Sequence, residues 1–190
     1  MGYLTIFFIA LGLSMDAFAV SLCSGIGAKK NKFKTAITLA SFFGFFQAAM
    51  PLIGWAAGYY FKDYITEADH WIAFVLLAFI GGKMLLESFK NKGCQPARNT
   101  TKITVVLGLA IATSIDAMAA GLSFALLEIP LFHAVGIIGI VTFIVSFAGV
   151  YIGGRTFRLL GKKAEMAGGI VLIAIGIKIL LEHLLFTTAI

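Results

Sequence analysis

Six long apolar segments, separated by short polar stretches, dominate the pattern of hydrophobic and polar positions along the chain. They cover roughly residues 3–26, 35–61, 71–88, 103–127, 132–153 and 166–186. About 20 apolar residues are enough for a helix to cross the hydrocarbon core of a bilayer. The alternating pattern of a transmembrane barrel strand is not found in the sequence. The pattern therefore predicts an all-α polytopic membrane protein with six transmembrane helices.

Basic residues are concentrated in alternate loops. Of the 15 Lys and Arg residues, 12 lie in the loops after the first, third and fifth segments, whereas the other loops hold only Lys62. The twelve are Lys29, Lys30, Lys32, Lys34, Lys90, Lys92, Arg98, Lys102, Arg155, Arg158, Lys162 and Lys163. The positive-inside rule places these three loops in the cytoplasm and both termini on the periplasmic or extracellular side. The net charge of +6 therefore orients the protein in the membrane, and no nucleic-acid partner is expected.

The amino-acid composition also indicates a membrane protein. Hydrophobic residues make up 60% of the chain and charged residues 13%, against about 25% charged residues in soluble domains. The loops are too short to fold alone, so residues 1–190 are expected to form a single membrane domain. Cys23 and Cys94 form neither a metal motif nor a disulfide framework, and neither is assigned a role.

The chain also contains an internal repeat. Residues 10–22 read ALGLSMDAFAVSL and residues 110–122 read AIATSIDAMAAGL, with six identical positions. Residues 80–87, IGGKMLLE, similarly match residues 175–182, IGIKILLE. The matches come in the same order in each half, which favours duplication over chance.

The repeat predicts an inverted topology. Repeat 1 covers residues 1–95 and repeat 2 covers 103–190, joined by a basic cytoplasmic linker at 89–102. Each half holds three helices, and an odd number makes the second copy enter the membrane upside down. Secondary transporters are often built this way, with their binding site near the midplane between the repeats.

Two aspartates, Asp16 and Asp116, fall near the middle of the first and fourth segments. An acid at that depth costs roughly 2.5–3.5 kcal/mol in insertion experiments. Small residues such as Gly12 and Ala19 surround Asp16 at helical spacing, and small residues also flank Asp116, which favours close helix packing. We expect the two carboxylates to face each other across the repeat axis. The alternative is a packing role through hydrogen bonds to neighbouring helices, but duplication of a costly group favours function.

Two facing carboxylates match one divalent cation. Oxygen ligands suit hard ions such as Mg²⁺, Ca²⁺ and Mn²⁺, and the absence of thiolate or imidazole near the midplane argues against Zn²⁺ and Cu⁺. Asp16 and Asp116 are therefore the predicted metal ligands. Neutral oxygens that could join them belong to Ser14, Gln47, Thr113 and Ser114.

Two further charged pairs lie within the apolar segments. Lys83 with Glu87, and Lys178 with Glu182, have the i,i+4 spacing of helical ion pairs. We interpret them as structural pairs that reach towards the membrane surface, with a gating role as the alternative. The role of His70, His133 and His183 at the outer edge stays open.

The chain resembles the MntP family of manganese efflux pumps. The resemblance is carried by SMDAFAVS (14–21), MPLIGW (50–55), HWIAFVLLAFIGGKM (70–84), SIDAMA (114–119) and GKKAEMAGGIVLIAIGIKILLE (161–182), in order along essentially the whole chain. It implies Mn²⁺ export across a bacterial inner membrane, with the family's motif acids on Asp16 and Asp116. Some family variants carry an acid where this chain has Gln47.

These observations predict a secondary transporter that exports a divalent metal ion, Mn²⁺ first among the candidates, by proton antiport. No nucleotide site is present, because Gly82 and Lys83 are followed by Met84 and no glycine-rich loop precedes them. No cofactor and no enzymatic activity are expected. The expected partners are the metal ion and membrane lipid, with a homo-oligomer left open.

Two alternatives belong to other classes. An exporter of amino acids or other small solutes on a related six-helix plan would need a cation near the midplane for the substrate carboxylate, and none is evident. An intramembrane aspartyl protease also needs two embedded aspartates. Its GxGD context is absent, since residues 13–16 read LSMD and 113–116 read TSID.

Overall fold

The computed structural model describes residues 3–28, 31–61, 69–89, 103–126, 131–153 and 157–187. Within these ranges all regular secondary structure is helical. The helices are α1 (Tyr3–Gly27), α2 (Lys32–Phe61), α3 (Asp69–Phe89), α4 (Ile103–Thr113), α5 (Ile115–Leu126), α6 (Leu131–Ile152) and α7 (Phe157–Thr187). Only Ser114 separates α4 from α5, so these two helices form one broken span. The helices thus correspond to the six predicted segments, and the all-α membrane class is confirmed.

The spans differ in how apolar they are. Among the described residues, α1, α2, the α4–α5 span and α6 are long and apolar enough to cross a membrane. In α3 and α7 the apolar stretch is shorter and ends at a lysine, covering Phe74–Lys83 and Met166–Lys178. Large apolar side chains such as Phe45, Phe79 and Ile140 are exposed on the outside of the bundle, as expected of a surface in contact with lipid.

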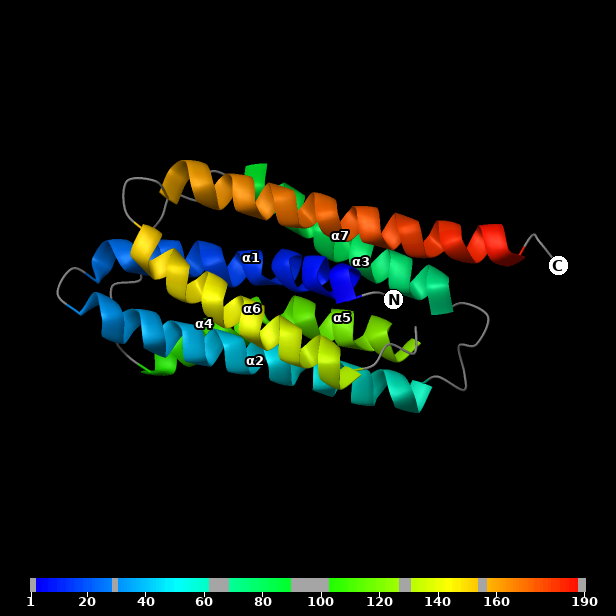
Figure 1. Ribbon diagram of the computed structural model, residues 1–190, viewed down its shortest axis with the longest axis horizontal. Helices are drawn as coiled ribbons and strands as arrows, with labels where there is room; N and C mark the ends of the chain where they lie inside the picture. Colours follow the sequence, from blue (N-terminus) through cyan, green and yellow to red (C-terminus); the bar gives the residue numbers. More distant parts are fainter. Residues whose placement is uncertain are drawn as a thin grey trace.

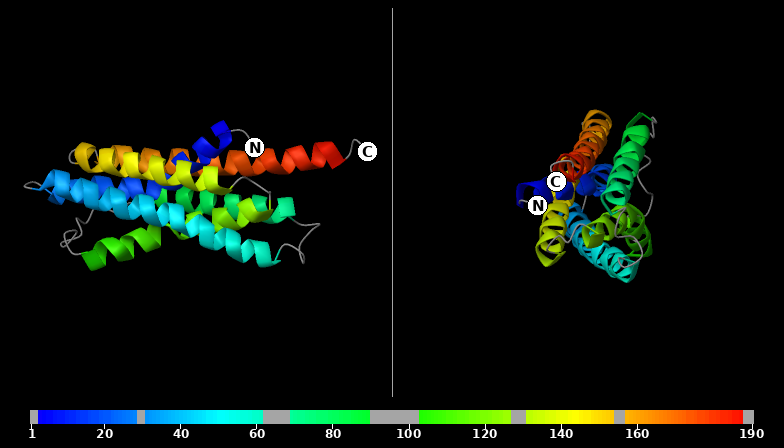
Figure 2. Two further views of the ribbon diagram at one scale, coloured as in Figure 1. Left: turned by 60° about the horizontal axis from the view of Figure 1, so that its bottom comes forward. Right: turned by 90° about the vertical axis from the view of Figure 1, so that its right-hand side faces the viewer.

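The helices form an elongated bundle with both chain termini at the same end (Figure 1). The α4–α5 span runs opposite to α1 (Figure 1). The end-on view shows α3 with α7 on one side and α2 with α6 on the other, with α1 between the two pairs and α5 beside α2 (Figure 2). In this arrangement α1 packs on α6 and α7, while α5 packs on α2 and α3. The helix that carries Asp16 therefore lies at the centre of the bundle, and the helix that carries Asp116 packs beside α2 and α3.

Two of the helix interfaces correspond to each other. Gly54 of α2 lies against the backbone of Met118 in α5, and Gly149 of α6 lies against Phe18 in α1. One turn further along, the same holds for Gly58 with Leu122 and for Gly153 with Leu22. A shift of 95 residues (149 − 54) relates the glycines, and a shift of 100 (118 − 18) relates their partners. Such reciprocity is what two copies related by a two-fold axis require, although the inverted repeat itself stays a prediction.

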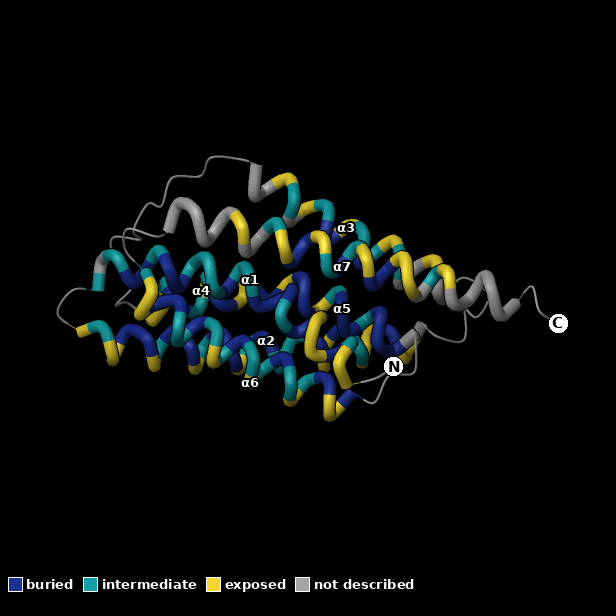
Figure 3. The backbone as a smooth tube through the Cα atoms, turned by 45° about the horizontal axis from the view of Figure 1, so that its top comes forward, coloured by how far each residue is buried: buried dark blue, intermediate teal, exposed yellow. Residues whose placement is uncertain are grey.

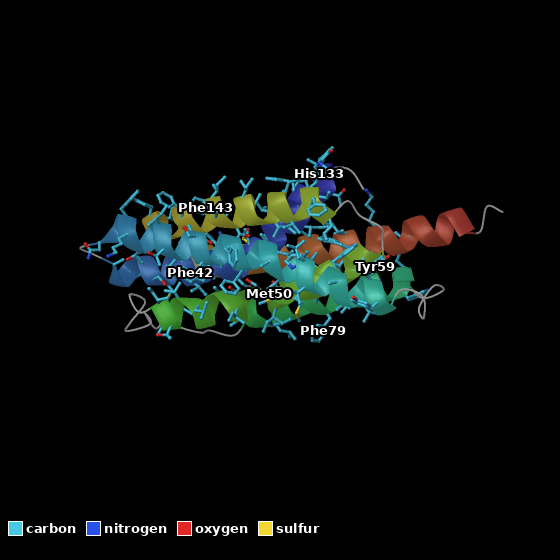
Figure 4. The ribbon with its side chains drawn as sticks, turned by 90° about the horizontal axis from the view of Figure 1, so that it is seen from below. Phe42, Met50, Tyr59, Phe79, His133 and Phe143 are labelled. Atoms are coloured by element: carbon cyan, nitrogen blue, oxygen red, sulfur yellow. The ribbon has the colours of Figure 1, made fainter. Side chains whose placement is uncertain are left out.

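Buried residues lie along the inside of the bundle (Figure 3) and form two apolar clusters. The lysine-side cluster, next to Lys32 at the start of α2, consists of Ala17, Ala36, Leu39, Phe43, Val106, Ala110 and Val150. The termini-side cluster is larger and includes Ile6, Ile9, Leu13, Ala117 and Phe124. Tyr59 and His133 lie in the half of the bundle that carries the termini (Figure 4).

One cysteine differs from the sequence-based expectation. Cys23, near the end of α1, is disulfide-bonded, whereas the sequence analysis assigned no disulfide. Cys94 lies outside the described residues.

Candidate ion-binding site

The fourth transmembrane span is interrupted two residues before Asp116. The backbone N–H of Ser114 donates to the carbonyl of Ile111, three residues back, at 3.1 Å. The Ser114 hydroxyl donates to the carbonyl of Ala110 at 2.7 Å, and the Thr113 hydroxyl donates to the carbonyl of Leu109 at 3.0 Å, with that of Ala110 at 3.2 Å. Side chains that bond to nearby carbonyls compete with the helical ladder and commonly bend helices. The pair of hydroxyls in this one turn is the local cause of the break.

Asp116 lies in the first turn of α5, directly after this break. Its side chain is 7% exposed, and Oδ1 accepts a hydrogen bond from the N–H of Ala117 at 2.8 Å. The partial positive charge at a helix N-terminus stabilises an anion at this position. Oδ2 is buried without a hydrogen-bond partner. A buried carboxylate oxygen with no donor is an available ligand for a cation.

Asp16 lies on a helix without a break. α1 continues from Tyr3 to Gly27, and the Asp16 side chain is half-buried. The charge of Asp16 contributes to the electrostatics of Asp116, as expected if the two carboxylates share one site, and their role as metal ligands stays a prediction. They come from different halves of the chain, on α1 and α5.

Gln47 of α2 reaches the turn of α1 that carries Asp16. Its Nε2 donates to the backbone carbonyl of Leu13 at 2.8 Å, and a helical carbonyl points towards the residue four positions later, here Ala17. The Gln47 side chain is fully buried, and its Oε1 has no hydrogen-bond partner. Gln47 therefore adds a neutral oxygen acceptor beside Asp16.

The three predicted hydroxyl ligands differ in how well they are placed. Each donates its proton to a carbonyl of its own span, with Ser14 bonded to Leu11 at 2.8 Å. Only oxygen lone pairs therefore remain for a cation. Thr113 and Ser114 lie at the break beside Asp116. Ser14 lies two residues from Asp16 on an unbroken helix, which puts the two side chains about 160° apart around the axis, so its position supports a ligand role least.

Lys83 contributes to the electrostatics of Asp116, which its spacing in the sequence did not indicate. Its side chain is exposed on α3, yet its charge acts on Asp116, because α3 packs on α5. Lys178 is likewise exposed on α7. The side chains of Glu87 and Glu182 lie outside the described residues, so the two i,i+4 pairs stay predictions.

Thr142 of α6 is a further polar residue that the sequence analysis missed. It is fully buried, and its Oγ1 has no hydrogen-bond partner. It follows Gln47 by 95 residues (142 − 47), the shift that relates Gly54 to Gly149. Extending the repeat alignment through the second helix of each half would have identified it.

The ligand set is confined to oxygen. Across the described part of the chain, no group of three or more His, Cys, Asp and Glu residues could hold a metal ion. A cation between Asp16 and Asp116 would therefore have two carboxylates and neutral oxygens as ligands. This arrangement suits a hard or borderline divalent ion and not one that selects thiolate.

Comparison with known proteins gives a consistent match. A family described as "Putative manganese efflux pump" matches residues 30–180. Proteins named "Putative manganese efflux pump MntP" are 50% identical in Gloeothece citriformis, 47% in Clostridium perfringens and 48% in Bacteroides thetaiotaomicron. The matches cover 95–98% of this chain and 96–99% of those proteins. No solved structure matches the chain.

Proposed function

The chain belongs to the MntP family of manganese efflux pumps, and from this premise we propose that it exports Mn²⁺ from the cytoplasm by proton antiport. The premise supports a membrane transporter of metal ions. The ion, its ligands, the direction and the coupling are proposed below from the residues.

The observation that carries the proposal is the set of buried oxygens without donors around the two aspartates. Among the described residues, Asp116 Oδ2 and Gln47 Oε1 are both buried and have no hydrogen-bond partner, and the negative charge of Asp16 contributes to the electrostatics of Asp116. Two like charges that interact in a low-dielectric interior are unfavourable unless a cation or a proton joins them. One divalent ion neutralises both carboxylates at once.

The donor atoms support Mn²⁺ over softer metals. Carboxylate, amide and hydroxyl oxygens suit Mg²⁺, Ca²⁺ and Mn²⁺. Mg²⁺ loses its water reluctantly and demands near-ideal octahedral geometry. A site with two carboxylates, one amide and few further oxygens therefore suits Mn²⁺ better than Mg²⁺.

Export requires an energy source. Moving a divalent cation out of a negative interior costs roughly 4.6 kcal/mol per 100 mV, twice the cost for a single charge. In the proposed cycle Asp16 and Asp116 release the metal on the outside, take up protons, and return neutral. One pair of groups then serves both ions in turn.

The direction is tested in cells of a bacterium that lacks the gene. We expect these cells to accumulate Mn²⁺ and to grow poorly in excess MnCl₂, and expression of the chain to reverse both effects. Metal content is measured by mass spectrometry for Mn, Fe, Zn, Mg and Ca. Unchanged manganese with a rise in another metal would assign a different ion, and no change in any metal would reject metal export.

The coupling is tested in vesicles that contain the purified protein and a pH-sensitive dye. Movement of Mn²⁺ should shift the internal pH, and a proton ionophore should remove the part of transport that a pH gradient drives. Transport without proton flux would reject antiport and leave Na⁺ as the next coupling ion to test.

A further inference from the structure

We infer that the two apolar clusters are the two gates of the transport path, with Phe43 as the gate residue on the lysine side and Phe124 as the gate residue on the termini side. This inference rests on the proposed function, since a gate has meaning only for a carrier. It assigns roles to two aromatic residues outside the binding site.

The clusters meet at the aspartates. On α1, Leu13 belongs to the termini-side cluster and Ala17 to the lysine-side cluster, with Asp16 between them. On the fourth span, Ala110 belongs to the lysine-side cluster and Ala117 to the termini-side cluster. Asp116 lies at this second boundary. Both carboxylates therefore occupy the plane where one apolar cluster ends and the other begins.

Each cluster closes the path to a charged solute. A cation stripped of water does not cross a packed apolar layer, because burial of an uncompensated charge is prohibitively costly. In the proposed cycle, an ion reaches the site only when one cluster opens. Opening both at once would make a leak, so the two must open in turn.

Each cluster contains one fully buried phenylalanine. Phe43 is 0% exposed and Phe124 is 1% exposed, and both rank among the largest fully buried side chains. Phe43 comes from α2, while Phe124 comes from α5. Truncating either one to alanine removes a phenyl ring from its own cluster and leaves the other cluster intact.

A hydrogen bond also links two helices beside the lysine-side gate. Lys32 Nζ, at the start of α2, donates to the backbone carbonyl of Tyr151 at 2.9 Å. The same ammonium lies 5.8 Å from the centre of the Tyr151 ring, within cation–π range. Tyr151 follows Val150 of the cluster, so this contact holds α2 to the end of α6 beside the lysine-side gate.

The test measures access to the site from each face of the membrane without requiring transport. The reporter is Asp16→Cys in a chain where Cys23 and Cys94 are replaced by serine, checked for monodispersity in detergent. A membrane-impermeant maleimide is added to spheroplasts or to inside-out vesicles. Lys34→Cys and Tyr60→Cys, both at exposed positions at opposite ends of the bundle, define which preparation exposes which end.

With both phenylalanines present, the reporter should react slowly from either face. Phe43→Ala should raise its labelling rate at least tenfold from the face that labels Lys34→Cys. Phe124→Ala should do so from the face that labels Tyr60→Cys. Phe45→Ala is the matched control, because Phe45 is 67% exposed on the same helix as Phe43, and it should change neither rate.

Labelling from the same face in both variants, or no acceleration in either, would overturn the gate assignment. Should an alanine variant aggregate, Phe43→Leu and Phe124→Leu make the same comparison with a smaller cavity. The outcome is separable from the proposed function: wild-type export by Asp16→Asn would reject the ion site, while the labelling pattern would still decide the gates.

Discussion

The two halves of the molecule carry nearly the same motif on different backbones. SMDA, with Asp16, lies within the unbroken helix α1, whereas SIDA, with Asp116, follows the break between α4 and α5. The residue just before the motif differs between the copies. It is Leu13 in the first and Thr113 in the second, and the Thr113 hydroxyl adds a second donor to the Ala110 carbonyl.

This difference gives the two carboxylates different surroundings. Asp16 can offer a cation only its side chain, and the neighbouring carbonyl of Leu13 already accepts from Gln47. Asp116 lies at a helix N-terminus and has one oxygen held by Ala117 and one without a partner. Both halves thus carry the charge, but only the half with Asp116 has a break in the helix beside it.

The largest effect is expected from neutralising either aspartate. Asp16→Asn and Asp116→Asn should each reduce Mn²⁺ export roughly 100-fold or more, because the one remaining carboxylate leaves a divalent ion half-neutralised in a low-dielectric site. The measurement is initial transport rate in vesicles at matched protein content. Wild-type export by one of the two variants would contradict the claim that both aspartates hold the ion, since one half of the chain would then suffice.

The control for these variants is Ser123→Ala. Ser123 is a buried polar residue on α5 whose hydroxyl donates to the Ala119 carbonyl of its own helix at 3.3 Å, and loss of this hydroxyl should leave export within about twofold of wild type. A large loss there would mean that any polar change in α5 stops transport.

A second prediction concerns the glycine contacts between α2 and α5 and between α6 and α1, the helices that carry the two aspartate motifs and their neighbours. A Cβ added at Gly54 would collide with the backbone oxygen of Met118, whereas at Gly149 the closest atoms are side-chain atoms of Phe18 and Ser21 at 3.0 Å. Gly54→Ala should therefore lower the free energy of unfolding by about 1–3 kcal/mol, and Gly149→Ala by less. Thermal unfolding in detergent measures both.

Gly82→Ala is the matched control, because a Cβ there meets nothing within 4 Å. It should be neutral or slightly stabilising, as expected for replacing glycine within a helix. Equal losses for Gly54→Ala and Gly82→Ala would show that the close contact between α2 and α5 is not what matters.

The architecture was largely predictable, and the irregular features were not. Six apolar segments and alternating basic loops indicated the helices, whereas the facing of Asp16 and Asp116 stays a prediction from the repeated motif. The break at Ser114 was missed, because serine and threonine are common within membrane helices and their competition for the Ala110 carbonyl depends on rotamers. The interaction of Lys83 with Asp116 was missed, because it depends on how α3 packs on α5.

A third, smaller effect is expected at Gln47. Gln47→Leu removes the unpartnered amide oxygen and keeps both carboxylates, so the KM for Mn²⁺ should rise roughly tenfold, which corresponds to about 1.4 kcal/mol. The maximal rate should change less. A fall in maximal rate with unchanged KM would assign Gln47 to helix packing through Leu13 instead.

The smallest effect is expected from Thr113→Val, which removes the hydroxyl and keeps the shape. With one competing donor gone, the turn before Asp116 should become more regular, and export should fall several-fold, since a net hydrogen bond is worth about 1 kcal/mol. Amide hydrogen exchange at residues 114–117 should slow. Unchanged exchange would show that Thr113 does not cause the break.

The most direct test of the central claim is Mn²⁺ binding to the purified protein, followed by the EPR signal of the free ion. If Asp16 and Asp116 hold one ion between them, wild-type protein should remove one equivalent of Mn²⁺ per chain from solution. Asp16→Asn and Asp116→Asn should each remove none at the same concentration. Two equivalents in the wild type with one retained in each variant would contradict the account, because each aspartate would then bind its own ion.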